Sequence, residues 1–356
     1  MIFSFFKSKS VLGVDLGTAT IKFVELAKDK GRFNLKNYGL LNLGEVTKSG
    51  SSKTMSLPSD DATVIGALKE LLAKSKVKTK DAVTAIPSFL TFATVLRLPY
   101  LSEKDLAKAI PFEARKYVPI PINNVILDWS IINIGEIQKT DSKGAYPDVE
   151  VFLAAVPKDE AARYRDILLN AGLDVKALEL ENIALARSLV GNDQSPVIIV
   201  NIGGRSTSIL IVDKGFERIS HNFEIGGFEI TKTLAKSLNV GLEKAEKMQR
   251  EIGLLGKEGA LISNSIVSLL DMMVFETKKT VNSYEEKTKI KVAKVILSGG
   301  LANMPGLVEF FKEKISLETS IGNSFARVIY PKELENVIKS LSPILAVACG
   351  LAMREI

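Results

Sequence analysis

Short apolar runs that end in an acidic or amide residue followed by glycine occur twice along this chain. Val11–Thr18 reads Val-Leu-Gly-Val-Asp-Leu-Gly-Thr, and Val197–Gly204 reads Val-Ile-Ile-Val-Asn-Ile-Gly-Gly. Polar residues and a second apolar run follow each of them. Short apolar runs bounded by glycine are typical of buried strands joined by a tight turn. The repeat therefore predicts a strand–turn–strand hairpin at the start of each half, and two similar domains that face each other.

The second half of the chain carries a third glycine turn and a long apolar helix pattern. Lys294–Gly306 reads as a buried strand, a turn at Gly299 and Gly300, and a helix from about Met304 to Ile315. Both glycines can adopt positive φ and let a ligand approach the backbone. Apolar residues at helical spacing predict a long helix from about Leu261 to Glu286. Small residues between Ser342 and Met353 predict a closely packed helix at the end of the chain.

The segment between the two hairpins has a different pattern, and we assign residues 82–173 to an inserted α+β subdomain. Ser102 is a good N-cap for a helix that reaches Tyr117, and Pro111 predicts a kink within it. A polar loop is expected from 135 to 148. The other expected elements are strands within 82–99, 125–134 and 149–156 and a helix from about 158 to 171.

The whole chain then divides into five segments. We expect residues 1–81 to form the first part of domain 1, 82–173 the insertion, 174–196 the return to domain 1, 197–341 domain 2, and 342–356 a helix that returns to domain 1.

Charge and residue usage exclude several classes of function. The 47 basic and 41 acidic residues give a net charge of only +6, and the basic stretch from Lys74 to Lys80 contains no aromatic residue. This composition argues against a nucleic-acid partner. With one histidine, His221, and one cysteine, Cys349, the chain lacks the residues for a serine-hydrolase triad, an internal disulfide or most zinc sites.

The sequence gives little sign of membrane insertion. We find no apolar run near the roughly 18 residues that a membrane helix needs. The N-terminal Met1–Phe6 is too short for a signal-peptide core, and its lysines follow the apolar stretch. Two interpretations of this tail stay open: it packs on the first strand or is disordered, or its phenylalanines and lysines touch a membrane surface.

The glycine turns are suited to binding a polyphosphate. Turns at strand ends present backbone N–H groups to phosphate oxygens, and two facing hairpins would hold a polyphosphate from both sides. Asp15 is placed to hold Mg²⁺ through water, and Thr18, Thr20 and Lys22 add hydroxyls and one cation. An aspartate that only stabilises its own turn is the alternative, and the repeated hairpin argues against it. Neither a P-loop nor a dinucleotide-binding glycine motif is present.

The order of these motifs resembles the superfamily of actin, sugar kinases and heat-shock chaperones (ASKHA, with a ribonuclease-H-like core). The insertion resembles the subdomain 1C (SHS2-like) of the FtsA-like branch. Within that branch, Phe112–Pro121, Val125–Trp129 and Ile225–Thr231 resemble PilM-type proteins of type IV pilus assembly, as do Ala171–Leu173 and Leu178–Glu181. The resemblance covers residues 11–353 and implies a two-domain α/β actin-like fold.

The resemblance also implies roles for residues at matching positions. Glu181 lies where related ATPases place a residue that orients water; a charge at a helix N-terminus is the equally open alternative. Asn201 replaces a common aspartate and is implied to touch the metal through water. The other implied ligand-binding residues are Asp15, Gly17, Thr18, Thr20 and Lys22 for phosphate and metal, Gly203, Gly204 and Thr207 opposite them, and Gly226, Gly227, Glu246, Gln249, Gly299, Gly300 and Asn303 around the nucleoside.

Three departures from the family pattern qualify these expectations. Asn201 lacks the charge that would activate water, Gln249 stands where lysine is common, and Pro111 interrupts the 1C helix. We therefore expect ATP and Mg²⁺ to bind, with slow hydrolysis at most.

The implied partner is the cytoplasmic N-terminal peptide of PilN, held in a groove between subdomains 1A and 1C. Other pilus platform proteins, motor ATPases and a homo-oligomer stay open. We expect a cytoplasmic protein at the periphery of the inner membrane, which it reaches through partners or through its N-terminal tail. The alternatives are an FtsA-like division protein, which typically has a C-terminal amphipathic helix not evident after Arg354, and a sugar kinase, which would need a further catalytic acid.

Overall fold

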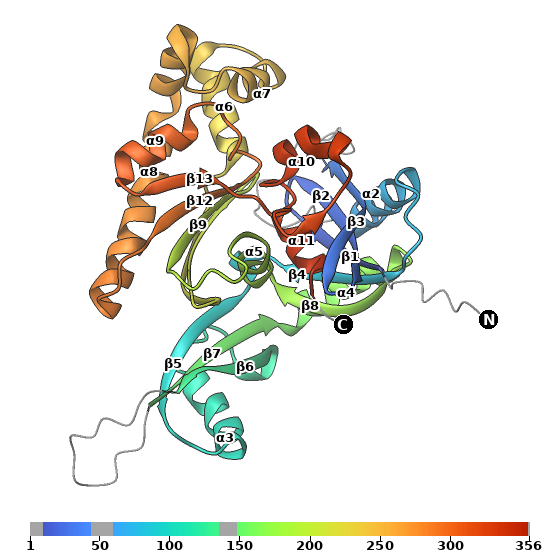
Figure 1. Ribbon diagram of the computed structural model, residues 1–356, viewed down its shortest axis with the longest axis vertical. Helices are drawn as coiled ribbons and strands as arrows, with labels where there is room; N and C mark the ends of the chain where they lie inside the picture. Colours follow the sequence, from blue (N-terminus) through green and yellow to red (C-terminus); the bar gives the residue numbers. More distant parts are fainter. Residues whose placement is uncertain (1–9, 44–59, 135–147, 355–356) are drawn as a thin grey trace.

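A computed structural model describes residues 10–43, 60–134 and 148–354, which form three sheets (Figure 1). The expected polar loop and the N-terminal tail fall almost wholly outside these residues. The first sheet has the strand order β14-β3-β2-β1-β4-β8. Its strands are β1 (Ser10–Leu16), β2 (Thr20–Asp29), β3 (Arg32–Asn42), β4 (Asp81–Ile86), β8 (Asp174–Leu180) and β14 (Val328–Ile329).

Helices cover the first sheet on both faces. Helices α2 (Asp61–Lys74) and α4 (Lys158–Asn170) share an apolar core with β1 and β2. Helices α5 (Glu181–Leu189) and α11 (Ala346–Ala352) pack together next to β1 and β4. A Cβ on Gly13 would lie 2.0 Å from the carbonyl oxygen of Ala348, and one on Gly350 would lie 1.9 Å from that of Ala184. The close packing that we predicted for the last helix is therefore confirmed.

The second sheet has the order β11-β10-β9-β12-β13 and forms the other half of the molecule (Figure 1). Its apolar face packs against the long helix α8 (Gly256–Thr288), which is longer than the helix we predicted. The other elements of this half are β9 (Val197–Ile202), β10 (Thr207–Asp213), β11 (Phe216–Phe223), β12 (Lys294–Gly299), β13 (Glu318–Ile321), α6 (Gly227–Leu238), α7 (Leu242–Glu251) and α9 (Leu307–Ile315).

The inserted subdomain is a three-stranded sheet, β5-β7-β6, with the helix α3 (Glu103–Ala114) packed on it. The Ser102 side chain accepts a hydrogen bond from the backbone N–H of Asp105 at 3.2 Å, so the predicted N-cap is confirmed. Strand β6 pairs with β7 alone among the described strands and forms one edge of this sheet. The strands are β5 (Phe92–Pro99), β6 (Val125–Ile134) and β7 (Asp148–Pro157).

Two of the segment boundaries that we expected disagree with the way the strands pair in the sheets. Strand β4 pairs with β1 and β8, and α4 shares the first core, so both belong with the first sheet and not with the insertion. The segment that leaves the first sheet therefore runs from about 92 to 157. In the same way, β14 pairs with β3, so the chain returns to domain 1 before residue 328 and not at 342. Both boundaries follow from pairing between strands that are far apart in the chain. The local sequence does not show this pairing.

One helix passes a length and composition test for a membrane span, which our count of apolar runs did not anticipate. Helix α8 contains an 18-residue window with a mean hydropathy of 1.3, of which 33% is buried inside the molecule. Its residues Ile262, Ile266 and Leu270 lie in the core beside the second sheet. A bent pair, residues 332–341 with 346–352, also passes the test at an angle of 118°. A core helix of this length satisfies the same criteria.

Candidate functional site

The first glycine hairpin places an ion pair at the end of β1. Asp15 and Lys22 are opposite each other in the β1–β2 ladder, and the Lys22 Nζ donates to Asp15 Oδ2 at 2.9 Å. The Gly17 N–H donates to the carbonyl of Thr20 at 3.0 Å and closes the turn, in which Thr18 and Thr20 are partly buried. The predicted hairpin is confirmed, with a buried carboxylate beside a lysine.

The second hairpin has the same form, and its turn touches the first. Asn201 lies opposite Ser208 in the β9–β10 ladder, and the Gly203 N–H donates to Ser206 O at 2.9 Å. A Cβ on Gly204 would lie only 2.6 Å from the Cβ of Ala19 in the first turn. The two turns therefore face each other across the gap between the sheets, as the repeat predicted.

Glu181 links the second hairpin to the residues that follow β4. Its Oε1 accepts from the Asn201 side-chain amide at 3.1 Å, and its Oε2 accepts from the backbone N–H of Ser88 at 2.9 Å. Burial of the carboxylate raises the pKa of Glu181 above its ordinary value of 4.5, and the negative charge of Asp15 raises it further. Lys22 and the Ser88 hydrogen bonds act in the opposite direction.

Sheet geometry explains why these residues meet. Strands β1, β4 and β8 are parallel, so their carboxyl ends lie at one edge of the first sheet. Asp15 lies near the end of β1, Ser88 follows β4, and Glu181 follows β8. Asn201 lies near the end of β9, which is parallel to β12. Ligands of open α/β sheets bind at carboxyl ends of this kind.

Ser88 and Asn222 belong to the site, and our sequence analysis missed both. The Ser88 hydroxyl donates to Asn222 Oδ1 at 2.9 Å, which links the first domain to β11 of the second. Ser88 lies within the segment 82–99 that we described as strands, and its polar side chain after the apolar residues up to Ile86 was the available signal. Asn222 had no such signal, because its position follows from the β10–β11 register, where it pairs with Ser208.

The start of α6 rests on the second turn. The Gly227 and Phe228 N–H groups donate to the carbonyls of Gly203 and Gly204 at 2.9 and 2.8 Å. A Cβ on Gly226 would lie 2.7 Å from Gly203 O. The Thr207 hydroxyl donates to Ile225 O at 2.6 Å. Thr207 therefore uses its only proton to fix this junction, and its expected place opposite the first hairpin in the ligand site stays a prediction.

The other residues expected around the nucleoside lie on α7, at the end of β12 and in the turn that follows β12. Gly299 has a φ of +88°, and a Cβ there would lie 2.2 Å from Ile202 O, whereas a Cβ on Gly300 would meet nothing within 4 Å. The Gln249 side chain accepts from the Thr231 hydroxyl at 2.6 Å, and Glu246 is exposed on the same helix. Asn303 donates to Ser340 O at 2.7 Å.

The donor set suits a small hard cation beside phosphate. Asp15, Glu181 and Asn201 provide carboxylate and amide oxygens, which Mg²⁺ prefers, and Lys22 provides a cation for phosphate. Among the described residues, no group of three His, Cys, Asp or Glu could hold a metal ion by protein ligands alone. These residues would therefore fit a cation that is held mainly through its own water molecules, next to a phosphate.

Comparisons with known proteins agree with this architecture. The sequence model of the family described as type IV pilus assembly protein PilM matches residues 13–356, nearly the whole chain. This chain belongs to the PilM family. Its fold is the two-domain actin-like fold of that family, as the motif order predicted.

Three further proteins show how widely this fold is shared. The cell division protein FtsA of Neisseria meningitidis serogroup B is 24% identical, with 87% of this chain and 82% of FtsA covered. The PilM chain of a PilM-PilN type IV pilus biogenesis complex superposes with a TM-score of 0.79 at 22% identity, over 97% and 98% of the two chains. MreB5 of Spiroplasma citri bound to AMPPNP gives a TM-score of 0.53 at 13% identity, over 97% and 95%.

Proposed function

We propose that this PilM-family protein binds ATP with Mg²⁺ between its two glycine hairpins and hydrolyses it slowly at most. One observation carries the proposal: Asp15, Lys22, Glu181 and Asn201 meet where strands of both sheets end. The turns at 17–20 and 203–206 would hold the phosphates from opposite sides. Asp15 and Lys22 would hold the metal and a phosphate oxygen, and Gly300 leaves room toward the nucleoside.

Slow hydrolysis follows from the chemistry around the attacking water. Glu181 carries the only carboxylate beside Asn201 in the described site, and it is bound by Ser88 and Asn201. Asn201 is neutral, so it can position a metal-bound water without activating it by charge. We therefore expect turnover far below the several per second of a common enzyme. Nucleotide would act mainly by setting the distance between the two turns.

Calorimetry with AMPPNP, with and without Mg²⁺, tests the binding proposal, and a thermal shift gives a second readout. We expect heat of binding and stabilisation, since a ligand that binds only the folded state raises its stability. The absence of heat and of any thermal shift at millimolar AMPPNP would refute it.

The second part of the proposal is that the inserted subdomain binds the N-terminal peptide of PilN on the cytoplasmic side of the membrane. Support comes from the PilM neighbour, whose complex contains PilN, and from the edge strand β6. An edge strand can accept an added extended peptide. Apolar side chains are exposed around it: Phe112, Tyr117, Ile120, Ile126 and Ile131.

A salt bridge links this subdomain to the second domain. Arg218 on β11 donates to Glu150 on β7 at 2.8 Å, and Arg97 on β5 contacts the same carboxylate at 3.2 Å. Burial favours a higher pKa for Glu150, but Arg218 and Arg97 together hold the pKa below its ordinary value. Through this contact, movement of the second sheet upon nucleotide binding would reach the peptide-binding sheet.

Fluorescence anisotropy with a labelled N-terminal PilN peptide tests the partner proposal. Ile126→Glu with Ile131→Glu should weaken binding at least tenfold, because both side chains are exposed on the edge strand. Leu169→Glu, at an exposed leucine on α4, is the matched control. Equal peptide affinity in the β6 variant and the control would place the partner elsewhere, and AMPPNP binding by the same proteins shows whether they are folded.

A further inference from the structure

A lysine-rich loop joins α2 to β4 at the edge of the first sheet where β1 begins (Figure 1). Between residues 69 and 80 the chain has one acidic residue, Glu70, and five lysines: Lys69, Lys74, Lys76, Lys78 and Lys80. The candidate nucleotide site lies at the other end of β1, beside Asp15. The loop therefore presents a basic surface that the proposed nucleotide site does not use.

Hydrogen bonds to two strands hold the backbone of this loop. The Asn37 side chain on β3 donates to Ser75 O at 2.6 Å, where the loop leaves α2. The Thr79 hydroxyl donates to Ser10 O at 3.0 Å, at the start of β1. A loop that is held near both ends has little backbone freedom to lose when it binds a partner.

Exposure alternates along the loop. Val77 and Thr79 are partly buried, and Val77 packs against the apolar core of the first domain. In contrast, Lys76, Lys78 and Lys80 are exposed. Within the part of the chain that the structure describes, none of these three lysines forms an ion pair. The alternation therefore directs three unpaired ammonium groups away from the core and toward solvent.

Most of the acidic groups beside the loop already have a lysine partner. Lys176 binds Asp81 at 3.1 Å, and Lys74 binds Glu70 at 2.6 Å. Asp174, exposed at the start of β8, lies next to the loop because its N–H donates to the carbonyl of residue 80 at 2.7 Å. Among the described residues, the loop thus keeps three unpaired lysines beside this one carboxylate.

The residues that precede β1 indicate which partner this surface suits. Ser10, whose carbonyl holds the loop, follows directly on Met1–Lys9, which contains three phenylalanines and two lysines. Aromatic and lysine residues together suit the boundary between lipid headgroups and acyl chains. Lysine clusters are attracted by anionic lipid, and stable anchoring takes two such signals. The loop itself has no aromatic residue on which a nucleic-acid base could stack.

We propose that the loop at 75–80, together with Met1–Lys9, binds an anionic membrane surface directly. The lysines supply the electrostatic attraction, and the phenylalanines supply apolar area that leaves water. This contact is separate from the proposed peptide site on β6 and requires neither nucleotide nor a partner protein.

Sedimentation of the full chain with vesicles of phosphatidylglycerol and phosphatidylcholine, against pure phosphatidylcholine, tests this surface. The combined substitution Lys76→Gln, Lys78→Gln and Lys80→Gln should weaken binding to the anionic vesicles at least tenfold, because the attraction adds up over the lysines. Added salt should weaken wild-type binding as well. The matched control makes the same change in net charge at exposed lysines of the second domain and should bind as the wild type does: Lys244→Gln, Lys247→Gln and Lys257→Gln.

Two further arms separate the possible outcomes. Phe3→Ser with Phe5→Ser should weaken vesicle binding and leave its salt dependence, and equal thermal unfolding of all variants shows that they fold. Duplex DNA at the same salt concentration should bind more weakly than the anionic vesicles. Loss of vesicle binding in the loop variant but not in the lysine control supports the proposal. It is overturned by equal loss in both lysine variants, by no effect of the phenylalanine changes, by tighter binding of DNA, or by wild-type protein that does not sediment with anionic vesicles.

Discussion

The two glycine hairpins share a backbone plan but differ in charge. In the first, Asp15 and Lys22 are cross-strand partners that form an ion pair at 2.9 Å. In the second, the corresponding partners are Asn201 and Ser208, both neutral, and Asn201 donates to Glu181. One hairpin can therefore attract a cation and a phosphate, while the other can only supply shape and hydrogen bonds. In the function that we propose, two side chains would thus give one strand–turn–strand unit a binding role and the other an orienting role.

The largest effect is expected at the charged hairpin. Asp15→Asn keeps the shape of the side chain but removes the charge that would hold the metal and pair with Lys22. We expect the magnesium-dependent part of AMPPNP affinity to fall about 100-fold, or about 2.7 kcal/mol. Titrations at several Mg²⁺ concentrations measure it. An unchanged magnesium dependence would show that the charge of the first hairpin has no role.

A second test addresses the contact between the hairpins. Gly204→Ala introduces a Cβ at 2.6 Å from the Cβ of Ala19, so the turns must move apart. We expect a loss of about 1–3 kcal/mol in unfolding free energy, as for overpacked cores, together with weaker nucleotide binding. Gly66→Ala on α2, where a Cβ meets nothing within 4 Å, is the control and should be neutral or stabilising. Urea denaturation compares them, and equal stabilities would mean that the turns do not meet.

A charge on the second hairpin should reduce the difference between the two hairpins. Asn201→Asp places a new carboxylate next to Glu181, in a site where Asp15 already raises the Glu181 pKa. We expect about 1–2 kcal/mol lower stability at neutral pH, in the range of the 1.4 kcal/mol that one pKa unit represents. Mg²⁺ with nucleotide should restore it, and phosphate release should rise above the wild-type rate. A variant that is as stable as the wild type and no faster would show that residue 201 lies outside the reacting site.

The smallest effect is a pH dependence at Glu181. Because its pKa is raised in the folded protein, the folded state binds the proton more tightly, and stability is lost as pH rises from about 4.5 through the raised value. Glu181→Gln removes this loss, so its stability relative to the wild type should grow by up to about 1.4 kcal/mol per unit of pKa shift. Glu243→Gln, at an exposed position, is the control. Urea denaturation between pH 4.5 and 8 measures the difference, and parallel curves would contradict it.

The hairpins and their turns could be predicted because local patterns encode them. Apolar runs, glycines and the repeated Asp/Asn position placed Asp15 and Asn201 correctly near the ends of two strands, and Gly17 and Gly204 on the turns that follow them. Contacts between distant strands could not be read in this way. The start that we expected for the insertion differs from the structure because β4 pairs with β1 and β8. No local signal in the sequence shows this pairing.

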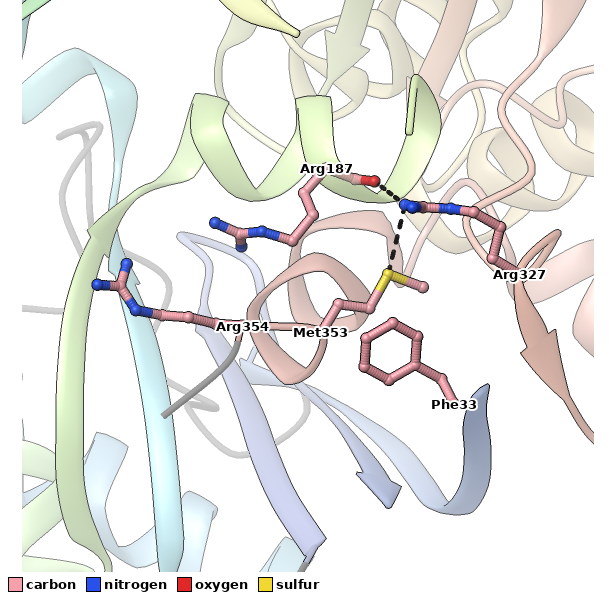
Figure 2. Close-up of a pocket in the computed structure, with 5 residues that line it drawn as sticks. All are labelled: Phe33, Arg187, Arg327, Met353 and Arg354. Atoms are coloured by element: carbon pink, nitrogen blue, oxygen red, sulfur yellow. Dashed lines mark hydrogen bonds between the residues drawn. The ribbon is translucent and has the colours of Figure 1, made fainter. Parts of the chain in front are cut away.

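The sequence analysis also could not predict which groups each side chain contacts in the folded protein. Thr207 was expected among the ligand-binding residues, but its sequence position did not show that its hydroxyl donates to Ile225 O. The cavity that Phe33, Arg187, Arg327 and Arg354 line (Figure 2) was not anticipated, because Phe33, Arg187 and Arg327 are far apart in the chain.

A crystal structure of the protein with AMPPNP and Mg²⁺ would test the central claim most directly. The account predicts electron density for the triphosphate between residues 17–20 and 203–206, with the metal next to Asp15 and the base toward Gly300. Soaked crystals would also show whether the Gly204–Ala19 contact opens. Nucleotide density at any other place, with the two turns still in contact and Asp15 still paired to Lys22 alone, would contradict it.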